Sequence, residues 1–184
     1  MLMLVTLSLA AVVIAWSIVC YNLLVRDRNR VAQAWSDVDV QLTRRHDLVP
    51  RLVEVVQQYA RYERTLLENV ATLRARGAAE PSPGARGALE GSLGNGMHRI
   101  IAVAESYPEL KASENFLDLQ RKLADTENQI QYARRYYNGA VNNLNTRIET
   151  FPDLLVARAL RFKPAEYFEL EAAEMAQAPL VGAR

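Results

Sequence analysis

Residues 116–151 read FLDLQRKLADTENQIQYARRYYNGAVNNLNTRIETF, and this stretch decides the fold. Apolar or small side chains recur at steps of three and four residues, the heptad pattern of a helix that packs against other helices. The seam consists of Phe116, Leu119, Leu123, Thr126, Ile130, Ala133, Tyr137, Val141, Leu144, Ile148 and Phe151. An unbroken helix of this length measures about 54 Å at ~1.5 Å per residue. Because so long a stripe must be buried against partner helices, we predict an all-α protein.

A second heptad pattern precedes this one. Its apolar positions are Val31, Trp35, Val38, Leu42, Val49, Leu52, Val56, Tyr59, Leu66, Val70 and Leu73, and the phase continues past Pro50. Either one long helix kinks at this proline, or a new helix begins near Asp47; the unbroken phase favours the kink. Arg45 and Glu63 interrupt the seam. We expect both to reach solvent at the bundle edges, and they could pair only if the chain folded back at Pro50.

Glycine and proline separate the two heptad regions. Residues 76–84, RGAAEPSPG, have no apolar period and predict a loop where the chain reverses. Glycines at 84, 87, 91 and 94 follow, and each costs a helix about 1 kcal/mol relative to alanine. We therefore expect a frayed first half in the helix that ends before Pro108; the alternative is a flat face for close helix approach. The next helix should start at Ser113. No stretch alternates with period two, so strands are not expected.

The amino-terminal segment, residues 1–25, carries no charged side chain, and Arg26, Arg28 and Arg30 follow it directly. A helix of this length is about 37 Å long, enough to cross a hydrocarbon core of about 30 Å. A cleaved signal or a lipoprotein site at Cys20 is the alternative. The run lacks a small-residue cleavage end, and Val19 stands where lipoprotein processing prefers a small residue. We predict an uncleaved transmembrane anchor followed by an antiparallel bundle of three or four long helices.

The position of the basic residues predicts the orientation of this anchor. Arginines occur shortly after the span and none precedes it, which places the amino terminus outside and the helical body in the cytoplasm. Arg26, Arg28 and Arg30 should contact the membrane surface, because each basic side chain gains about 1 kcal/mol beside an anionic leaflet. We therefore expect membrane lipid as a partner and a single-pass topology.

Composition and spacing argue against several classes of function. A net charge of +1, with 22 basic and 21 acidic residues, does not suggest a nucleic-acid partner. His46 and His98 lie far apart, so no zinc-binding histidine pair at helical spacing exists, and Cys20 lies in the predicted span away from any histidine base. The glycine-rich stretch lacks the lysine of a phosphate-binding loop. We predict no catalytic residue, metal or cofactor and therefore no enzyme.

The densest polar and aromatic cluster lies in the last long helix. It contains Tyr132, Arg134, Arg135, Tyr136, Tyr137, Asn138, Asn142, Asn143 and Asn145. Tyrosine, arginine and asparagine recur at protein interfaces, so these residues are a candidate partner surface. The alternative is that Tyr137 packs in the seam while the asparagines form hydrogen bonds within one bundle layer.

Several ordered motifs resemble the LemA family. They include the string from Ala34 to Leu42 (AWSDVDVQL), Asp47 to Pro50 (DLVP), Ala102 to Lys111 (AVAESYPELK), and Phe151-Pro152. The resemblance spans residues 21 to about 168. It implies a bacterial single-pass inner-membrane protein with a helical-bundle domain and no established reaction. Some members are associated with magnetosome membrane formation, and others are discussed beside a membrane-bound stress metalloprotease, which implies a role in envelope homeostasis.

The predicted domain organisation is an anchor at 1–25, a LemA-like bundle at 26–162 and an acidic tail at 163–184. Phe162, Tyr167 and Phe168, where the bundle leads into the tail, are expected to dock on the bundle. Three functions are compatible with this chain. A non-enzymatic scaffold would self-associate into a homo-oligomer and organise the membrane. An adaptor would present or regulate a membrane protein partner such as a protease. An enzyme would need a site that the sequence does not display.

Overall fold

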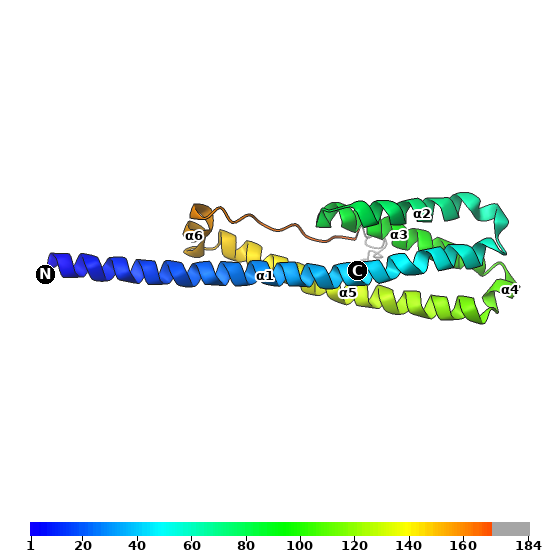
Figure 1. Ribbon diagram of the computed structural model, residues 1–184, viewed down its shortest axis with the longest axis horizontal. Helices are drawn as coiled ribbons and strands as arrows, with labels where there is room; N and C mark the ends of the chain where they lie inside the picture. Colours follow the sequence, from blue (N-terminus) through cyan, green and yellow to red (C-terminus); the bar gives the residue numbers. More distant parts are fainter. Residues whose placement is uncertain (171–184) are drawn as a thin grey trace, which may run out of the picture. The chain divides into compact units, whose positions relative to one another are not determined.

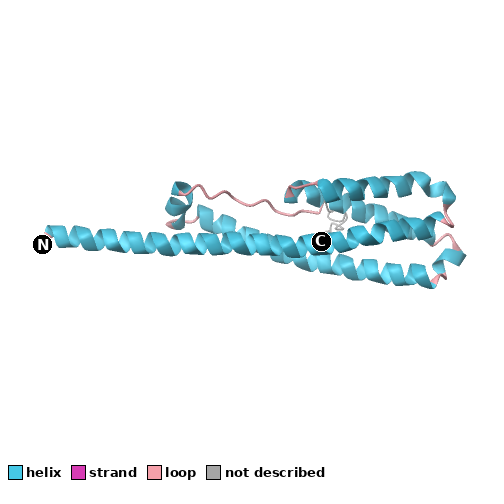
Figure 2. Ribbon diagram, in the orientation of Figure 1, coloured by secondary structure: helices cyan, strands magenta, loops and turns pink. Residues whose placement is uncertain are grey.

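The computed structural model describes residues 1–170, and all regular structure within them is helical (Figure 2). The helices follow in the order α1 (Leu2–Gln57), the 3-10 helix η1 (Arg61–Glu63), α2 (Arg64–Ala79), α3 (Pro83–Ala104), α4 (Pro108–Lys111), α5 (Glu114–Glu149) and α6 (Asp153–Ala159) (Figure 1). The all-α prediction is therefore confirmed. The long carboxy-terminal helix starts directly after Ser113, as its heptads and start signal predict.

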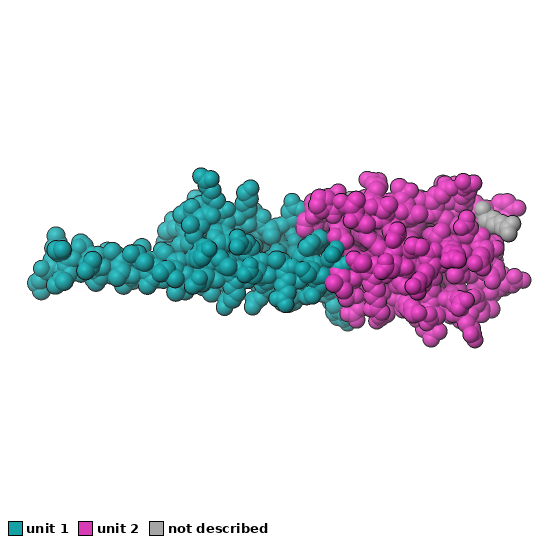
Figure 3. Space-filling view, viewed as in Figure 1, with its two compact units in different colours: residues 1–39, 132–167 teal, residues 40–131, 168–184 magenta. Residues whose placement is uncertain are grey.

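The chain divides into two compact units (Figure 3). Unit 1 comprises residues 1–39 and 132–167, and unit 2 comprises residues 40–131 and the chain from Phe168 onward. Both α1 and α5 contribute residues to each unit. The anchor, bundle and tail boundaries at 25 and 162 remain predictions from sequence, and the part of the tail after residue 170 lies outside the described residues.

Unit 2 has an apolar core to which α1, α2, α3, α4 and α5 contribute. Its fully buried side chains include Leu52 of α1, Val70 of α2, and Leu93 and Ile100 of α3, and Phe116 of α5 is almost fully buried. These residues occupy the heptad positions of α1, α2 and α5 and the apolar positions of α3. Burial of these stripes against one another is what stabilises the bundle.

The reversal between α2 and α3 is shorter than the loop expected at residues 76–84. It consists of residues 80–82 only, because α2 continues through the buried Gly77 to Ala79. Ser82 then caps α3: its hydroxyl accepts a hydrogen bond from the Ala85 N–H at 3.3 Å, and Pro83 occupies the first turn, where its missing N–H costs nothing. The expected loop length was wrong because these start signals lie inside the Pro- and Gly-rich segment.

The glycine-rich half of α3 is a regular helix, so the expectation that it is frayed was wrong. Gly96 is buried, and a Cβ atom built on it would lie 2.7 Å from the Val70 Cγ2 atom of α2. Only a residue without a side chain permits this approach of α2 and α3. The alternative reading of the glycines, a flat face for close helix packing, is the one that the structure supports.

Helix α1 continues through Pro50 without a break, which excludes a chain reversal there. A proline inside a helix cannot donate to the carbonyl four residues earlier, which here belongs to His46. The Arg74 Nε–H of α2 donates to that His46 oxygen at 2.7 Å. A side chain thus replaces the missing backbone donor, which explains how the helix tolerates the proline.

Unit 1 is built from the first part of α1, the second half of α5, α6 and the non-helical residues 160–167. Buried side chains of α1 (Leu24, Ala34 and Val38) and of α5 (Val141, Leu144) form its core. The Trp35 ring packs on Tyr137 with centroids 5.2 Å apart. Within this unit, the apolar amino-terminal part of α1 extends beyond α5 and α6 (Figure 1).

Candidate functional site

Unit 2 contains a cluster of buried charged side chains centred on Arg45 and Glu90. Arg45 is 1% exposed and Glu90 is 0% exposed, and the two form an ion pair between α1 and α3. The Arg45 Nη2 group also donates to the Glu90 carbonyl oxygen at 3.1 Å, and Nη1 donates to the Glu127 carboxylate of α5 at 3.1 Å. One guanidinium group therefore links three helices.

His46 completes this cluster. Its Nε2 atom lies 2.7 Å from the Glu90 carboxylate. Burial alone would raise the pKa of Glu90, but the hydrogen bond from His46 and the charge of Arg45 outweigh it and hold that pKa below its ordinary value. Gly77 leaves the space for the carboxylate, because a Cβ atom there would lie 2.7 Å from Glu90 Oε1.

The expectation that Arg45 reaches solvent was therefore wrong, and its partners are Glu90 and Glu127 rather than Glu63. The available signal was the charge at a seam position, since a charge inside a heptad stripe needs a buried partner. The partner was missed because Glu90 lies in the glycine-rich stretch, which shows no helical period. Arg45, His46 and Glu90 are buried and Glu127 is partly exposed, so the arrangement joins helices of unit 2 and leaves its central ion pair out of reach of a ligand.

A second charged network lies in unit 1, where α1, α5 and α6 meet. The Arg147 Nε group donates to the buried Asp27 carboxylate at 2.6 Å, and Nη1 donates to Asp153 at 3.0 Å. The bond to Asp27 is the main reason that the pKa of Arg147 is raised. The Cys20 thiol, 2% exposed, donates to the other Asp153 oxygen at 2.9 Å. Cys20 is thus a buried thiol rather than a lipid-facing one.

A polar cavity of about 410 Å³ opens beside this network. Three arginines and two aspartates line it together with amide and hydroxyl groups: Arg26, Asp27, Arg30, Asn142, Asn143, Thr146, Arg147, Thr150 and Asp153. It brings together residues of both predicted sites, namely Arg26 and Arg30 from the basic segment and Asn142 from the polar cluster. The sequence could not show this, because more than a hundred residues separate these side chains along the chain.

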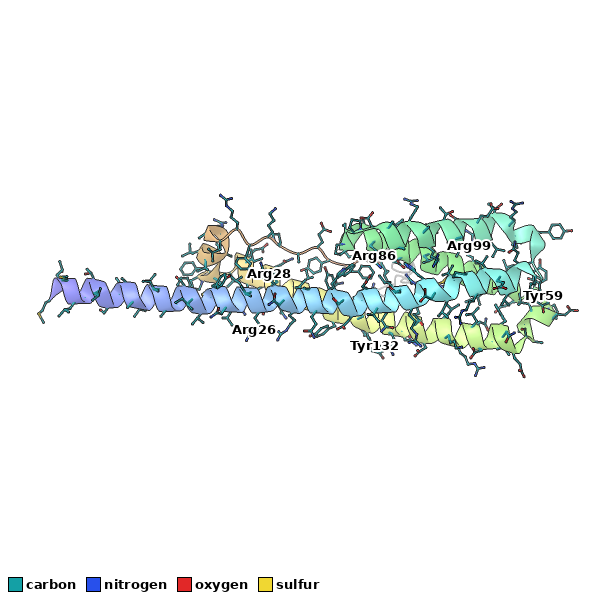
Figure 4. The ribbon with its side chains drawn as sticks, viewed as in Figure 1. Arg26, Arg28, Tyr59, Arg86, Arg99 and Tyr132 are labelled. Carbon is teal, nitrogen blue, oxygen red and sulfur yellow. The ribbon has the colours of Figure 1, made fainter. Side chains whose placement is uncertain are left out.

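The three arginines predicted to contact the membrane surface have different surroundings. Arg26 and Arg30 are exposed at the cavity, and Arg28 stacks on the Phe162 ring, with its guanidinium carbon 5.6 Å from the centroid. Arg26 and Arg28 are labelled on opposite sides of α1 in Figure 4. Contact with lipid remains a prediction for all three.

The predicted partner surface divides into buried and exposed members. Asn145 lies at the α5 face that the non-helical segment covers, where its side chain exchanges two hydrogen bonds with the Ala165 backbone (3.0 and 2.8 Å). Tyr137 is buried, its hydroxyl donates to the Glu166 carbonyl at 2.8 Å, and burial raises its pKa to about 12. These contacts match the alternative of hydrogen bonding within the bundle.

The remaining members of the cluster face outward to differing degrees. Tyr132 and Tyr136 are 61% and 54% exposed, and the Arg135 guanidinium lies 4.8 Å from the Tyr132 centroid (Figure 4). Arg134 and Asn138 are half-buried, and Asn142 is exposed. The exposed part of the predicted surface is therefore Tyr132, Arg135 and Tyr136, together with Asn142, which lines the cavity.

The first turns of α1 have the composition of a membrane span. Within the described residues, α1 is the one helix long and apolar enough to cross a membrane by length and composition, with a mean hydropathy of 2.5 over an 18-residue window, none of which is buried. Among those residues, His, Cys, Asp and Glu side chains form no group of three that could hold a metal ion.

Comparison with known proteins identifies the family. The sequence profile of the LemA family matches residues 34–182, which is most of the chain. The chain belongs to the LemA family. The profile covers most of the residues that form both units, so this LemA-family chain is related to other members through most of its helical body and not through a single motif.

Curated relatives of this LemA-family chain include magnetosome proteins. Magnetosome protein MamQ 1 of Paramagnetospirillum magneticum is 25% identical over 91% of this chain and 71% of its own length. Magnetosome protein MamQ of Magnetospirillum gryphiswaldense is 25% identical over 72% of this chain and 58% of its own. Protein LemA of Metamycoplasma hominis is 25% identical over 76% of this chain and 64% of its own.

Proposed function

We propose that this LemA-family chain is a membrane-anchored, non-enzymatic scaffold that organises the bacterial inner membrane. The observation that carries the proposal lies in unit 1. There the exposed apolar turns of α1 continue without a break into turns of the same helix that pack on α5 and α6. A helical unit joined to an anchor in this way moves with the membrane, which is what a scaffold requires.

Two further observations support a scaffold. The match to a magnetosome protein extends over 91% of this chain, so it includes most of the helical body. Arg45 and Glu90 are buried and pair with each other between two helices, so this ion pair offers no accessible reactive group. In this proposal the amino terminus lies outside and the helical body lies in the cytoplasm.

The particle mass of the full-length chain in a mild detergent tests the scaffold. We expect a homo-oligomer much larger than the 20.7 kDa chain. The matched control lacks residues 2–19 but keeps Cys20 and Leu24, which are buried in unit 1, and should form far smaller particles. Equal helical content by circular dichroism would show that the control is folded. Monomers in both samples would contradict the scaffold.

An adaptor for a membrane protein partner is the second candidate function. It is favoured by the exposed side chains of Tyr132, Arg135 and Tyr136, since exposed tyrosines and arginines are typical of protein contacts. The triple variant Y132A/R135A/Y136A should then lose a stoichiometric partner, such as a membrane protease, while its particle mass and thermal unfolding stay unchanged. A matched triple variant at Arg64, Thr65 and Glu68 of unit 2, all exposed, should keep the partner.

A further inference from the structure

Burial along α1 changes abruptly at one position in unit 1. Residues 2–15, 18 and 19 are exposed and Trp16 and Ser17 are half-exposed, whereas Cys20 is 2% and Leu24 is 0% exposed. The exposed apolar run, residues 2–19, is about 27 Å long as a helix, close to the thickness of a hydrocarbon core. The turns from Cys20 onward instead pack against protein. The burial pattern therefore gives a shorter span than the uncharged sequence from Met1 to Val25.

The segment from α6 to Lys163 lies beside the position where this run ends. The Cys20 thiol bonds to Asp153 in the first turn of α6, and the Tyr21 ring meets the Phe162 ring edge-on with centroids 6.3 Å apart. Figure 1 shows α6 against α1 at the end of its protruding part. If residues 2–19 cross a bilayer, then α6 lies at the level of its headgroups.

This segment has the composition of an element that rests on a membrane surface. Phe151, Leu155 and Leu160 are 74%, 56% and 53% exposed. Three exposed basic side chains, those of Arg158, Arg161 and Lys163, lie among them, and residues 154–165 contain no acidic residue. Exposed apolar side chains interspersed with basic ones are typical of segments that lie in the interface of an anionic membrane.

We propose that residues 151–163 dock on the surface of the same membrane that residues 2–19 cross. The inference rests on the anchoring in the proposed function and adds a second lipid contact to it. The occupant of the apolar surface is the bilayer rather than a second copy of the chain. The surface adjoins the lipid-exposed part of α1, and its three cations complement anionic headgroups. Trp16 and Tyr21 flank the same level, where aromatic side chains prefer to lie.

Depth-dependent fluorescence quenching in vesicles tests the docking. The full-length chain, with Cys20→Ser to keep a donor for Asp153, receives a single fluorescent label at Leu155→Cys or Leu160→Cys. The vesicles contain phosphatidylcholine, phosphatidylglycerol and a nitroxide lipid. One preparation carries the nitroxide near the headgroup, to quench labels at 155 and 160, and a second carries it deep in the acyl chain, to quench a label at 12. Val12→Cys labels the anchor, and Tyr136→Cys labels an exposed position of α5 in the same unit.

We expect quenching at positions 12, 155 and 160 and much weaker quenching at position 136. If the label at position 12 is quenched but the labels at 155 and 160 are quenched no more than the control label at 136, the docking is overturned and the anchor stands. Absence of quenching at 12 would overturn the anchor, and the docking with it. Labels at 155 and 160 that are shielded from aqueous iodide but not quenched by lipid would show that protein covers the surface, and would overturn the docking.

A charge variant provides the second test. R158Q/R161Q/K163Q should lower the quenching at position 155 in vesicles with phosphatidylglycerol and change it little in pure phosphatidylcholine. R64Q/R76Q/R99Q, which removes three exposed cations from unit 2, is the matched control and should leave the quenching as it was. Equal loss in both triple variants would indicate general charge attraction and would overturn a specific role of this segment.

Discussion

At the scale of single residues, Arg45 and Glu90 form a buried ion pair. Removing either partner alone should destabilise the folded chain. Glu90→Leu should lower the free energy of unfolding by about 3–5 kcal/mol, because it leaves the Arg45 guanidinium buried without its main partner. Arg45→Met should cost a similar amount. Thermal unfolding in mild detergent, followed by circular dichroism, measures both effects.

The double variant R45M/E90L is the control for this prediction. It should be more stable than either single variant, since it buries no unpaired charge at this site. Single variants within about 0.5 kcal/mol of the original chain, the range of ordinary surface changes, would show that the pair is not buried in solution.

The lowered pKa of Glu90 also predicts that the chain loses stability in acid. This pKa is lower in the folded chain than in the unfolded chain, whose glutamates titrate near their ordinary value of about 4.3. As the pH falls through that value, the unfolded chain binds the proton first, so stability decreases until the folded carboxylate is protonated too. The charged and titratable groups around it are Arg45 and His46 of α1, with Glu127 of α5 beyond Arg45.

The comparison of pH profiles isolates this contribution from those of other carboxylates. The original chain and Glu90→Gln are unfolded thermally at several values between about pH 6 and 3. The difference between their melting temperatures should shrink as the pH falls below about 4.3. A constant difference over this range would contradict a lowered pKa for Glu90.

At the scale of elements, α1 depends on α2 for the hydrogen bond that Pro50 cannot make. Arg74→Met should cost about 1–3 kcal/mol, because it leaves the His46 carbonyl without a donor. In a Pro50→Ala background the backbone N–H of residue 50 supplies that donor, so the same change should cost much less. Thermal unfolding of the four chains of this cycle measures the difference, and equal costs in both backgrounds would contradict the explanation.

Close packing of α2 on α3 gives a second prediction at this scale. Gly96→Ala should destabilise the chain despite better helix propensity, because the new Cβ atom meets Val70 at 2.7 Å; overpacking costs about 1–3 kcal/mol and the propensity returns about 1 kcal/mol. Gly94→Ala on the same helix, with its nearest atom at 3.7 Å, is the matched control and should stabilise the chain. Equal melting temperatures of the two variants would contradict the close approach.

Several elements were predictable because their signals are local and repeated. The seam from Phe116 to Ile148 predicts α5, and heptads that continue past Pro50 predict one helix there. The packing of α3 was not predictable, since glycines lower helix propensity whether or not another helix lies against them. The ion pair of Arg45 with Glu90 depends on that packing, because Glu90 lies on α3. The buried charged cluster around this pair was therefore not predictable either. Helix α6 has only seven residues, too few for a periodic signal.

At the scale of the whole molecule, the proposed orientation has a direct test. Tyr62, 97% exposed, is replaced by cysteine in the Cys20→Ser chain and treated with a membrane-impermeant maleimide in spheroplasts. Labelling should occur only after the membrane is opened, because the basic residues after the span favour a cytoplasmic body. Met3→Cys, near the amino terminus, should be labelled without opening, and the reverse result at both positions would invert the topology.

The chain has a single cysteine, Cys20, and its burial makes its reactivity informative. The Cys20 thiol is covered by its contact with Asp153, so a thiol reagent can reach it only when the first turn of α6 separates from α1. Its alkylation rate therefore reports the free energy of that local opening, as amide exchange does for backbone groups. The unmodified protein thus carries a built-in kinetic reporter, which can be followed in native membranes by mass spectrometry.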